Sequence, residues 1–393
     1  MEVKMRVSSK LVHLTDEIRE AVLAQLENAV YYGGEQAYRF EQELAAYLGV
    51  KHTVSVNSGT SALLVAAVAL GIGRGDEVLV PANVYVTNAE VPAFLGATPV
   101  FCDVDEDTAN ATAETLEARI TPRTKAIILT HLYGHAVDMD PVLALAKRHK
   151  LVVIEIGPHA LGAEYKGRKV GGLGDIGVFS LGSKNISVYA SGGAASTNSA
   201  DLHGEMTLVS RHGWPRQPFD ASLFDKVRFK DSPMSAMFPL DRNSLRPGLN
   251  LQLDEIPCAI GRIVLRSLDT WNERRRQVAA LYTKLLHDAH VPARPLAVRP
   301  WAKHAYLHYI VRAEKRDALL QYLIDSEIEA WIIYQIPIPD MHYYRQHYPT
   351  SPEVYPVARR LASDILALPI NPWIKDIEVE YVVDRIRKFY KTQ

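Results

Sequence analysis

The sequence contains very little cysteine and no long apolar run. Its 393 residues include only Cys102 and Cys258, both in apolar contexts. Two thiols cannot build a disulfide framework, so we expect both in the core and neither as a metal ligand or nucleophile. No apolar stretch approaches the ~18 residues that cross a bilayer, and the first ten residues have no signal-like apolar segment. We therefore expect a soluble, cytoplasmic protein.

The chain also lacks an excess of either charge. Lys and Arg total 44 and Asp and Glu total 45, which gives a formal net charge of −1. Nucleic acids and anionic membranes are bound mainly by basic surfaces, so neither is expected as the main partner, and a small-molecule ligand is. The length exceeds what one hydrophobic core usually fills, which favours one large and one small domain.

The first half of the chain alternates between helical and strand patterns. Residues 16–30 predict an amphipathic helix, and a second helical pattern ends at Gly49, a residue suited to a C-cap. Short β-branched runs then alternate with helical segments. In chain order the sequences are HTVSV, SALLVAAVAL, EVLVP, TPVFCDV, KAIILT, PVLALAKRHK and LVVIE. Strands and helices alternating at this spacing predict an α/β domain with a mostly parallel sheet, whose sites lie at the carboxyl ends of the strands.

The second half has a different organisation. IGVFSLGSKN and the small-residue stretch 190–197 predict two further strands, and a proline-rich, irregular segment follows residue 200. Residues 254–290 predict a long helix. Beyond it we expect strands at HAYLHYIVRA and IEAWIIYQI, and helices at KRDALLQYLIDS and DIEVEYVVDRIRKFY. We expect a large domain over residues 1–250 and a small α+β domain over residues 251–393.

The sequence VNSGTSALLVA places Ser58, Gly59 and Thr60 between a strand and a helix. Free backbone N–H groups and hydroxyls at such a junction favour a phosphate. An ordinary N-cap by Ser58 or Thr60 explains the same residues, and this motif alone does not decide between the two.

Lys184 lies in a turn of small residues after the strand IGVFSL. A lysine at a strand end can form a Schiff base if its surroundings lower its pKa. A solvated loop lysine is the commoner alternative.

The stretch HLYGHAVDMD contains His131, His135, Asp138 and Asp140, whose spacing fits no known zinc signature. We expect a structural turn that walls the site, and no metal site. GIGRGDE leads into a strand and not a helix, which excludes a dinucleotide-binding loop there.

Together these motifs resemble the DegT/DnrJ/EryC1/StrS sugar aminotransferases, which are pyridoxal-phosphate enzymes of fold type I. The resemblance covers nearly the whole chain. The matching segments, in order, are YYGGEQAYRFEQELAAYLG, VNSGTSAL, GDEVLVPANVYVTNAE, GATPVFCDVDEDT, ITPRTKAIILTHLYGHAVDMD, GAEYKGRKVGGLGDIGVFS, SKN with a following GGA, and GLNLQLDEIPCAI. It implies an aspartate-aminotransferase-like fold, with a three-layer large domain and a smaller α+β domain.

The resemblance also implies roles for individual residues. Lys184 is expected to form the Schiff base with pyridoxal 5'-phosphate and then to carry the proton during amino transfer. Tyr85 matches the aromatic residue that stacks on the cofactor ring. Asn250 is expected to reach the cofactor phosphate of a partner subunit, which implies a homodimer. The residues expected to hold the phosphate within one subunit are Gly59, Thr60, Ser61 and Ser183.

The sequence departs from the family at the end of the strand VVIE. The family's aspartate, which pairs with the pyridine nitrogen, falls on Ile156, and a glutamine near the ring falls on His159. A carboxylate keeps that nitrogen protonated and the ring electron-withdrawing, and isoleucine cannot. Glu155 is no obvious substitute, because adjacent strand residues face opposite sides of a sheet.

Two smaller departures concern the same region. FSLGSK is one residue shorter than the family's usual segment before the lysine. IIYQIPIP replaces a HYP…PLH pattern, which changes Ile333, Gln335 and Pro339 near the expected substrate. We therefore expect an atypical substrate.

Three accounts of the missing aspartate stay open. Amino transfer from glutamate or glutamine to a keto-sugar, a nucleotide-linked keto-sugar or a cyclitol ketone could proceed with an unprotonated nitrogen. Alternatively, the enzyme runs another pyridoxal-phosphate reaction, such as a dehydration. In the third account, the chain binds the cofactor as a catalytically impaired partner subunit. The first is the leading hypothesis, with a role in amino-sugar or antibiotic biosynthesis.

Overall fold

The computed structural model describes residues 5–9, 14–28, 33–182, 192–215 and 244–392. Its centre is a seven-stranded sheet in the order β1-β9-β8-β5-β4-β2-β3. The strands are β1 (His52–Val56), β2 (Glu77–Pro81), β3 (Thr98–Cys102), β4 (Thr124–Thr130), β5 (Val152–Ile156), β8 (Ile176–Ser180) and β9 (Gly193–Thr197). Neighbouring strands from β3 to β8 pair in parallel, and β9 pairs antiparallel with both β8 and β1. The mostly parallel sheet predicted from the sequence is thus confirmed.

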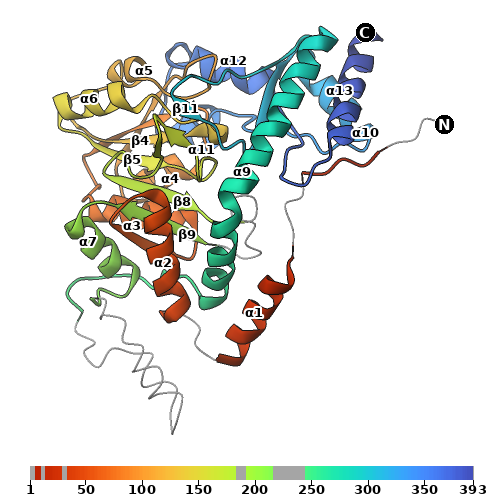
Figure 1. Cartoon of the computed structure of the whole chain (residues 1–393). Helices are drawn as coiled ribbons and strands as arrows, with labels where there is room; N and C mark the ends of the chain where they lie inside the picture. Colours follow the sequence, from red (N-terminus) through yellow and green to blue (C-terminus); the bar gives the residue numbers. More distant parts are fainter. Residues whose placement is uncertain (1–4, 10–13, 29–32, 183–191, 216–243, 393) are drawn as a thin grey trace.

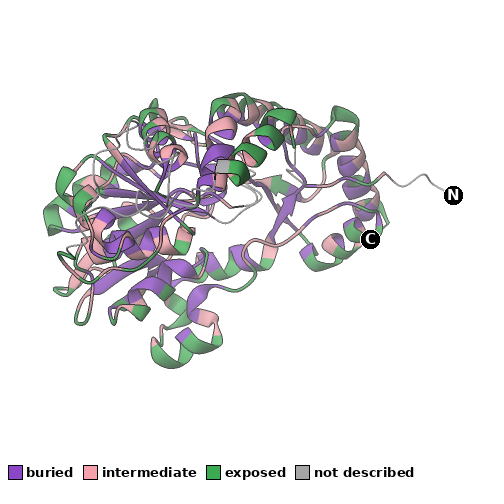
Figure 2. Cartoon of the chain, turned by 90° about the horizontal axis from the view of Figure 1, so that it is seen from below, coloured by how far each residue is buried: buried purple, intermediate pink, exposed green. Residues whose placement is uncertain are grey.

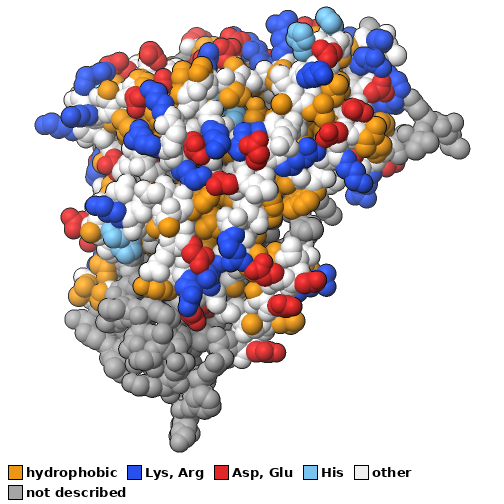
Figure 3. Space-filling view, viewed as in Figure 1, with side chains coloured by type: hydrophobic (Ala, Val, Ile, Leu, Met, Phe, Trp, Pro, Cys, Tyr) orange, Lys and Arg blue, Asp and Glu red, His pale blue; other side chains and the backbone are white. Residues whose placement is uncertain are grey.

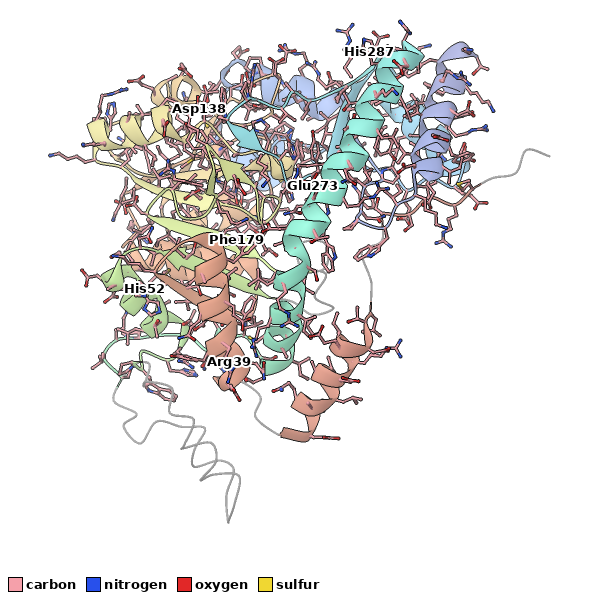
Figure 4. All side chains as sticks on the ribbon, viewed as in Figure 1. Arg39, His52, Asp138, Phe179, Glu273 and His287 are labelled. Atoms are coloured by element: carbon pink, nitrogen blue, oxygen red, sulfur yellow. The ribbon has the colours of Figure 1, made fainter. Side chains whose placement is uncertain are left out.

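Helices cover both faces of this sheet (Figure 1). One face packs against α3 (Gly59–Ala69), α4 (Thr87–Phe94) and α7 (Ala200–Ser210). The opposite face packs against α5 (Ala113–Glu117) and α6 (Met139–His149) at one side, and against α2 (Glu35–Leu48) and α9 (Glu255–Ala289) at the other. Figure 4 labels Phe179 of β8 on this second side, between the sheet and α2. The result is a three-layer α/β body.

A second, smaller sheet contains β10 (Ala293–Pro295), β12 (Tyr309–Ala313) and β13 (Ile365–Leu368). α10 (Arg316–Asp325) and α13 (Asp376–Lys391) pack beside it in their own core, together with Val7 near the N-terminus. Figure 2 shows the buried residues gathered around the two sheets. The remaining elements are α1 (Asp16–Asn28), α11 (His342–His347), α12 (Pro356–Asp364), β6 (Glu164–Tyr165), β7 (Arg168–Lys169) and β11 (Ala302–Lys303), with 3-10 turns η1 (Leu132–Gly134), η2 (Ile338–Asp340) and η3 (Pro352–Val354).

The 35-residue helix α9 belongs to both bodies. Its first half contributes Cys258, Ile260 and Val264 to the core beneath the large sheet, and its second half contributes Tyr282 and Leu286 to the core of the small one. Glu255, its first residue, accepts the backbone N–H groups of residues 34, 36 and 37 at 2.8 to 3.2 Å and so caps α2. The long helix predicted over 254–290 is confirmed.

One predicted strand is wrong. The segment IEAWIIYQI forms only isolated bridges, from Ile328 to Val7 and from Trp331 to Ala367. Its later residues leave the small sheet and approach the large one, where the Ile338 N–H donates to the Ala82 carbonyl at 2.8 Å. An apolar, β-branched run predicts a strand only where a neighbouring strand continues beside it, and here none does among the described residues.

Cys102 and Cys258 are both buried and free, as expected from their apolar contexts. No helix in the described ranges combines the length and the apolar character needed to cross a membrane. On the face shown in Figure 3, acidic and basic side chains are interspersed.

Candidate functional site

The site begins where β1 ends and α3 starts. Ser58 is the N-cap of α3, and its Oγ accepts the Ser61 N–H at 3.0 Å. The Ser61 hydroxyl donates in turn to Asn57 Oδ1 at 2.6 Å, while Thr60 is exposed in the first turn. A helix leaves its first N–H groups without internal partners, and its dipole favours an anion there. The N-cap and the anion site suggested by the sequence are therefore compatible.

The sheet brings a further hydroxyl to this helix start. A Cβ added to Gly59 would lie 2.7 Å from Cβ and 3.3 Å from Oγ of Ser180, the last residue of β8. A Cβ added to Gly193, on the strand between them, would lie 2.1 Å from the Ser58 carbonyl oxygen. Only glycine fits at these two positions. The half-buried Ser180 was not among the residues predicted from the sequence.

Tyr85 lies in the loop between β2 and α4, at the same carboxyl edge of the sheet. Its side chain is 59% exposed. The neighbouring Thr87 places its Oγ1 3.5 Å from Oγ1 of Thr60, so this loop adjoins the start of α3. An exposed aromatic ring beside a helix N-terminus is suited to cover a planar ligand held by a phosphate.

At the end of β5, adjacent residues face opposite sides of the sheet, as strand alternation predicts. Ile156 packs in the core on the α3 face and is 6% exposed. Glu155 is fully buried on the other face. There its carboxylate accepts the backbone N–H groups of Gly171, Leu173 and Gly174 at 2.6 to 2.9 Å. One of its oxygens also lies 2.9 Å from His131 Nε2. Glu155 is therefore fully engaged away from the site, and an apolar side chain occupies the site face.

The Glu155 carboxyl is held ionised by these contacts. Burial by itself would raise its pKa, but the hydrogen bond from His131 and the N–H groups of Gly174 and Gly171 outweigh burial, so its pKa lies below its usual range. His131 Nδ1 accepts the Val137 N–H at 3.1 Å, so the ring hydrogen is on Nε2 and points to Glu155. This pair fixes the loop over residues 171–174 behind the site.

His159 lies half-buried, three residues beyond Ile156. Its Nδ1 accepts the backbone N–H of Tyr133 at 3.2 Å. The Tyr133 and Tyr334 rings lie nearly parallel to the imidazole, at interplanar angles of 11° and 16°, and His308 meets it edge-on with ring centroids 4.8 Å apart. Tyr133 and Tyr334 were not predicted as site residues, although the neighbours Ile333 and Gln335 of Tyr334 were expected near the substrate.

The stretch HLYGHAVDMD forms the turn η1 and the start of α6. His135 is buried, with Nε2 accepting the Arg299 N–H at 3.0 Å, and burial is the main cause that lowers its pKa to about 4. Asp138 accepts the Tyr165 hydroxyl at 2.6 Å, and Asp140 pairs with Lys166 at 2.6 Å. The stretch therefore has the structural turn that we expected. Within the described ranges, no group of three or more His, Cys, Asp or Glu side chains could hold a metal ion.

The other predicted residues stand as follows. Gly59, Thr60 and Ser61 come together at the start of α3, with Tyr85 next to them. Asn250 is exposed and forms an isolated antiparallel β-bridge with Arg211. The carbonyl of the following Leu251 accepts the Asn57 N–H at 2.8 Å, so this segment borders the start of α3. Ser183 and Lys184 lie outside the described residues.

Comparison with known proteins decides the family. The sequence model of the DegT/DnrJ/EryC1/StrS aminotransferase family matches residues 12–387. The chain belongs to this family.

Several DegT/DnrJ/EryC1/StrS members are similar over nearly their whole length. A Geobacillus stearothermophilus protein named pleiotropic regulatory protein is 33% identical, over 98% of this chain and 97% of its own. The UDP-N-acetyl-3-dehydro-alpha-D-glucosamine 3-aminotransferase of Acidithiobacillus ferrooxidans is 35% identical, over 95% and 94%. Among solved structures, S. venezuelae DesV in complex with a ketimine intermediate is 32% identical, with a TM-score of 0.85 over 95% and 94%. The aminotransferase-like fold and the resemblance predicted from the sequence are confirmed.

The family implies pyridoxal phosphate as the cofactor, and the described residues fit part of it. The α3 start, with its first N–H groups and the hydroxyls of Thr60 and Ser180, has donors that suit a phosphate dianion. The Ser61 hydroxyl donates to Asn57 here and would have to turn to join them. At the end of β5, Ile156 offers neither a charge nor a hydrogen bond to a ring nitrogen. The phosphate end of the site therefore fits, while at the position where the sequence predicts the ring nitrogen the described strand end offers the apolar side chain of Ile156.

Proposed function

We propose that the protein is a pyridoxal-phosphate-dependent aminotransferase that moves an amino group from glutamate or glutamine to a ketone on a sugar, a nucleotide-linked sugar or a cyclitol. The observation that supports this best is the phosphate-compatible start of α3, with Gly59 against Ser180 at the carboxyl edge of the sheet. The sugar-type acceptor is supported by the name of the A. ferrooxidans relative. The named role of that relative suggests amino-sugar biosynthesis.

Bound pyridoxal phosphate supplies a ring that withdraws electrons while an amino group moves between amino acid and ketone. Gly59, Thr60 and Ser61 would hold the phosphate, with Ser180 and Ser183 as further hydroxyl donors. Tyr85 would cover one face of the ring, and Ile156 and His159 would line its far end. Lys184 would be the attachment lysine and would then carry the proton at the reacting carbon.

A half-reaction tests this without knowledge of the acceptor. Purified protein is loaded with pyridoxal phosphate and mixed with glutamate or glutamine, and the absorption spectrum reports conversion of the aldehyde form to the amine form. We expect conversion with one donor, and no attached cofactor in Lys184→Ala after borohydride treatment. Failure of both donors would refute the aminotransferase proposal.

The missing acid favours a second candidate function. With Ile156 at the ring-nitrogen end, the chain could run a dehydratase-like reaction on a sugar, or bind cofactor as an impaired partner subunit. In both cases the cofactor binds, but neither amino donor converts it. Ile156→Asp should then introduce the half-reaction, whereas the neutral control Ile156→Asn, which has a side chain of the same size as aspartate, should not.

We also propose a homodimer in which Asn250 reaches the phosphate in the partner subunit. Leu249, beside Asn250, is 49% exposed. Helix α1 projects from the rest of the molecule (Figure 1), and its Leu23 and Leu26 are 59% and 62% exposed. Exposed leucines on a projecting helix are suited to an interface between copies. Light scattering should give twice the chain mass of 43.8 kDa. Asn250→Ala should weaken cofactor binding without dissociating the dimer.

Two further proposals concern organisation and location. We propose that residues 1–250 and 251–393 make up the large and small domains, except that Val7 packs in the small core and α9 is common to both cores. The free thiols of Cys102 and Cys258 support a reducing compartment, and we propose the cytoplasm.

A further inference from the structure

The segment that contains Tyr334 connects the small sheet to the large one. Trp331 bridges Ala367 of β13, and the Ile338 N–H donates to the Ala82 carbonyl, directly after β2. Between these anchors, the half-buried Tyr334 lies with its ring centroid 6.0 Å from that of Tyr85. Tyr334 is therefore a small-domain side chain held at the carboxyl edge of the central sheet.

The hydrogen bonds at His159 have a defined direction. Nδ1 accepts the Tyr133 N–H, so the neutral imidazole carries its hydrogen on Nε2. Tyr334 Oη lies 3.5 Å from that Nε2, at the long end of the hydrogen-bond range, and is the acceptor in this pair. The Tyr133 hydroxyl donates to the Ile333 carbonyl, which ties the same tyrosine to the residue before Tyr334.

A phenol that accepts from His159 keeps its own hydrogen for another partner. Burial raises the pKa of Tyr334, so the hydroxyl stays protonated at neutral pH and acts as a donor. Within the part of the chain that the structure describes, the rings in contact with His159 are those of Tyr133, Tyr334 and His308. The neighbouring exposed ring is Tyr85, on the side where the ligand is expected.

We infer that Tyr334 is a substrate-binding residue, whose hydroxyl is oriented by the Tyr133–His159 chain to donate to a substrate oxygen beside Tyr85. The inference rests on the proposed function. The oxygen belongs to the donor carboxylate in one half-reaction and to a sugar hydroxyl or carbonyl in the other, since both substrates of an aminotransferase react at the same cofactor. One donor group can serve both, because both are oxygen acceptors.

The first test is spectroscopic and needs neither cofactor nor substrate. Nitrogen-15 spectra of protein with labelled histidine report the tautomer of each imidazole, and His159→Gln identifies the His159 signals. We expect a neutral His159 with hydrogen on Nε2 in the native chain. In Tyr334→Phe the tautomer should persist, while the Nε2 hydrogen should exchange faster with water. A hydrogen on Nδ1, or unchanged exchange in the variant, would overturn the inference.

The second test uses glutamate and glutamine as probes of the cofactor-loaded protein. Tyr334→Phe should raise the half-saturating concentration of the active donor about three- to tenfold, the effect of one lost hydrogen bond, with a maximum rate within about twofold. Tyr322→Phe, on α10 in the other part of the small domain, is the control and should change neither value. Equal kinetics in Tyr334→Phe and native protein would refute the donor role. If the native protein converts neither donor, the proposed function fails, and the spectra still decide whether His159 orients Tyr334.

Discussion

The buried carboxylate of Glu155 gives the most quantitative prediction. In Glu155→Gln the amide oxygen can still accept the N–H groups of Leu173 and Gly174, which both bind Oε1 of the native carboxylate. The new NH₂ group then faces the Gly171 N–H and His131 Nε2–H, both bound to Oε2 in the native chain. His131 cannot turn its acceptor nitrogen to this side without losing the Val137 N–H. Two buried donors therefore lose their acceptor, at about 1 to 3 kcal/mol each.

We expect Glu155→Gln to lower the free energy of unfolding at pH 7 by about 2 to 6 kcal/mol. Urea unfolding followed by tryptophan fluorescence measures this. Glu20→Gln, on the exposed surface of α1, is the matched control and should change stability by less than about 0.5 kcal/mol. A loss at position 155 no larger than that of the control would refute our account of the carboxylate.

The pH dependence follows from the lowered pKa of Glu155. A carboxyl whose pKa is lower in the folded state contributes its full stabilisation above its unfolded value, about 4.3, and loses it as the pH falls through the folded value. The difference between native protein and Glu155→Gln should therefore be constant from pH 6 to 8. It should shrink only in acid below about pH 4.3.

Three further predictions concern the site and the core. Gly59→Ala should weaken pyridoxal-phosphate binding at least tenfold in a titration, because the new methyl would lie 2.7 Å from Ser180 Cβ. Gly204→Ala is the control and should not change the affinity, since no atom lies within 4 Å of a Cβ added there. Equal affinities in the two variants would contradict the crowding at Gly59. Ser180→Ala should weaken the same binding about tenfold, as expected for a lost hydrogen bond to a charged group, and an unchanged affinity would remove Ser180 from the phosphate site. Arg275 is 2% exposed, and its Nε and Nη2 have no partner among the described residues. Burial lowers the pKa of its guanidinium to about 10. Arg275→Met should therefore leave the thermal midpoint unchanged or raise it, and a large fall would show that the native structure stabilises the charge.

The parts of the site that the sequence predicted are those with local signals. Ser58 and Gly59 lie at the junction between β1 and α3, which neighbouring residues in the sequence define, and strand alternation correctly separates Glu155 from Ile156. Ser180 could not be found in this way, because it meets Gly59 only through the strand order β1-β9-β8. A search for hydroxyls at the carboxyl ends of all predicted strands would have included it.

Tyr334 escaped prediction for a related reason. Its segment has the composition of a strand, yet anchors at Trp331 and Ile338 lead it away from the small sheet. The composition of a segment shows that it can form a strand. Whether it does depends on a neighbouring strand lying beside it to pair with. Most of the fold was predictable from alternating patterns, whereas contacts between distant segments were not.

Helix α9 has a mechanical consequence. At 1.5 Å per residue its 35 residues extend about 52 Å, and its two halves are embedded in different cores. Any rotation of the small domain toward the ligand must either bend α9 or shift it relative to α2, whose first turn is hydrogen-bonded to Glu255. Movements at the ligand therefore belong to short segments such as 331–341, and the two bodies should melt together in a single thermal transition.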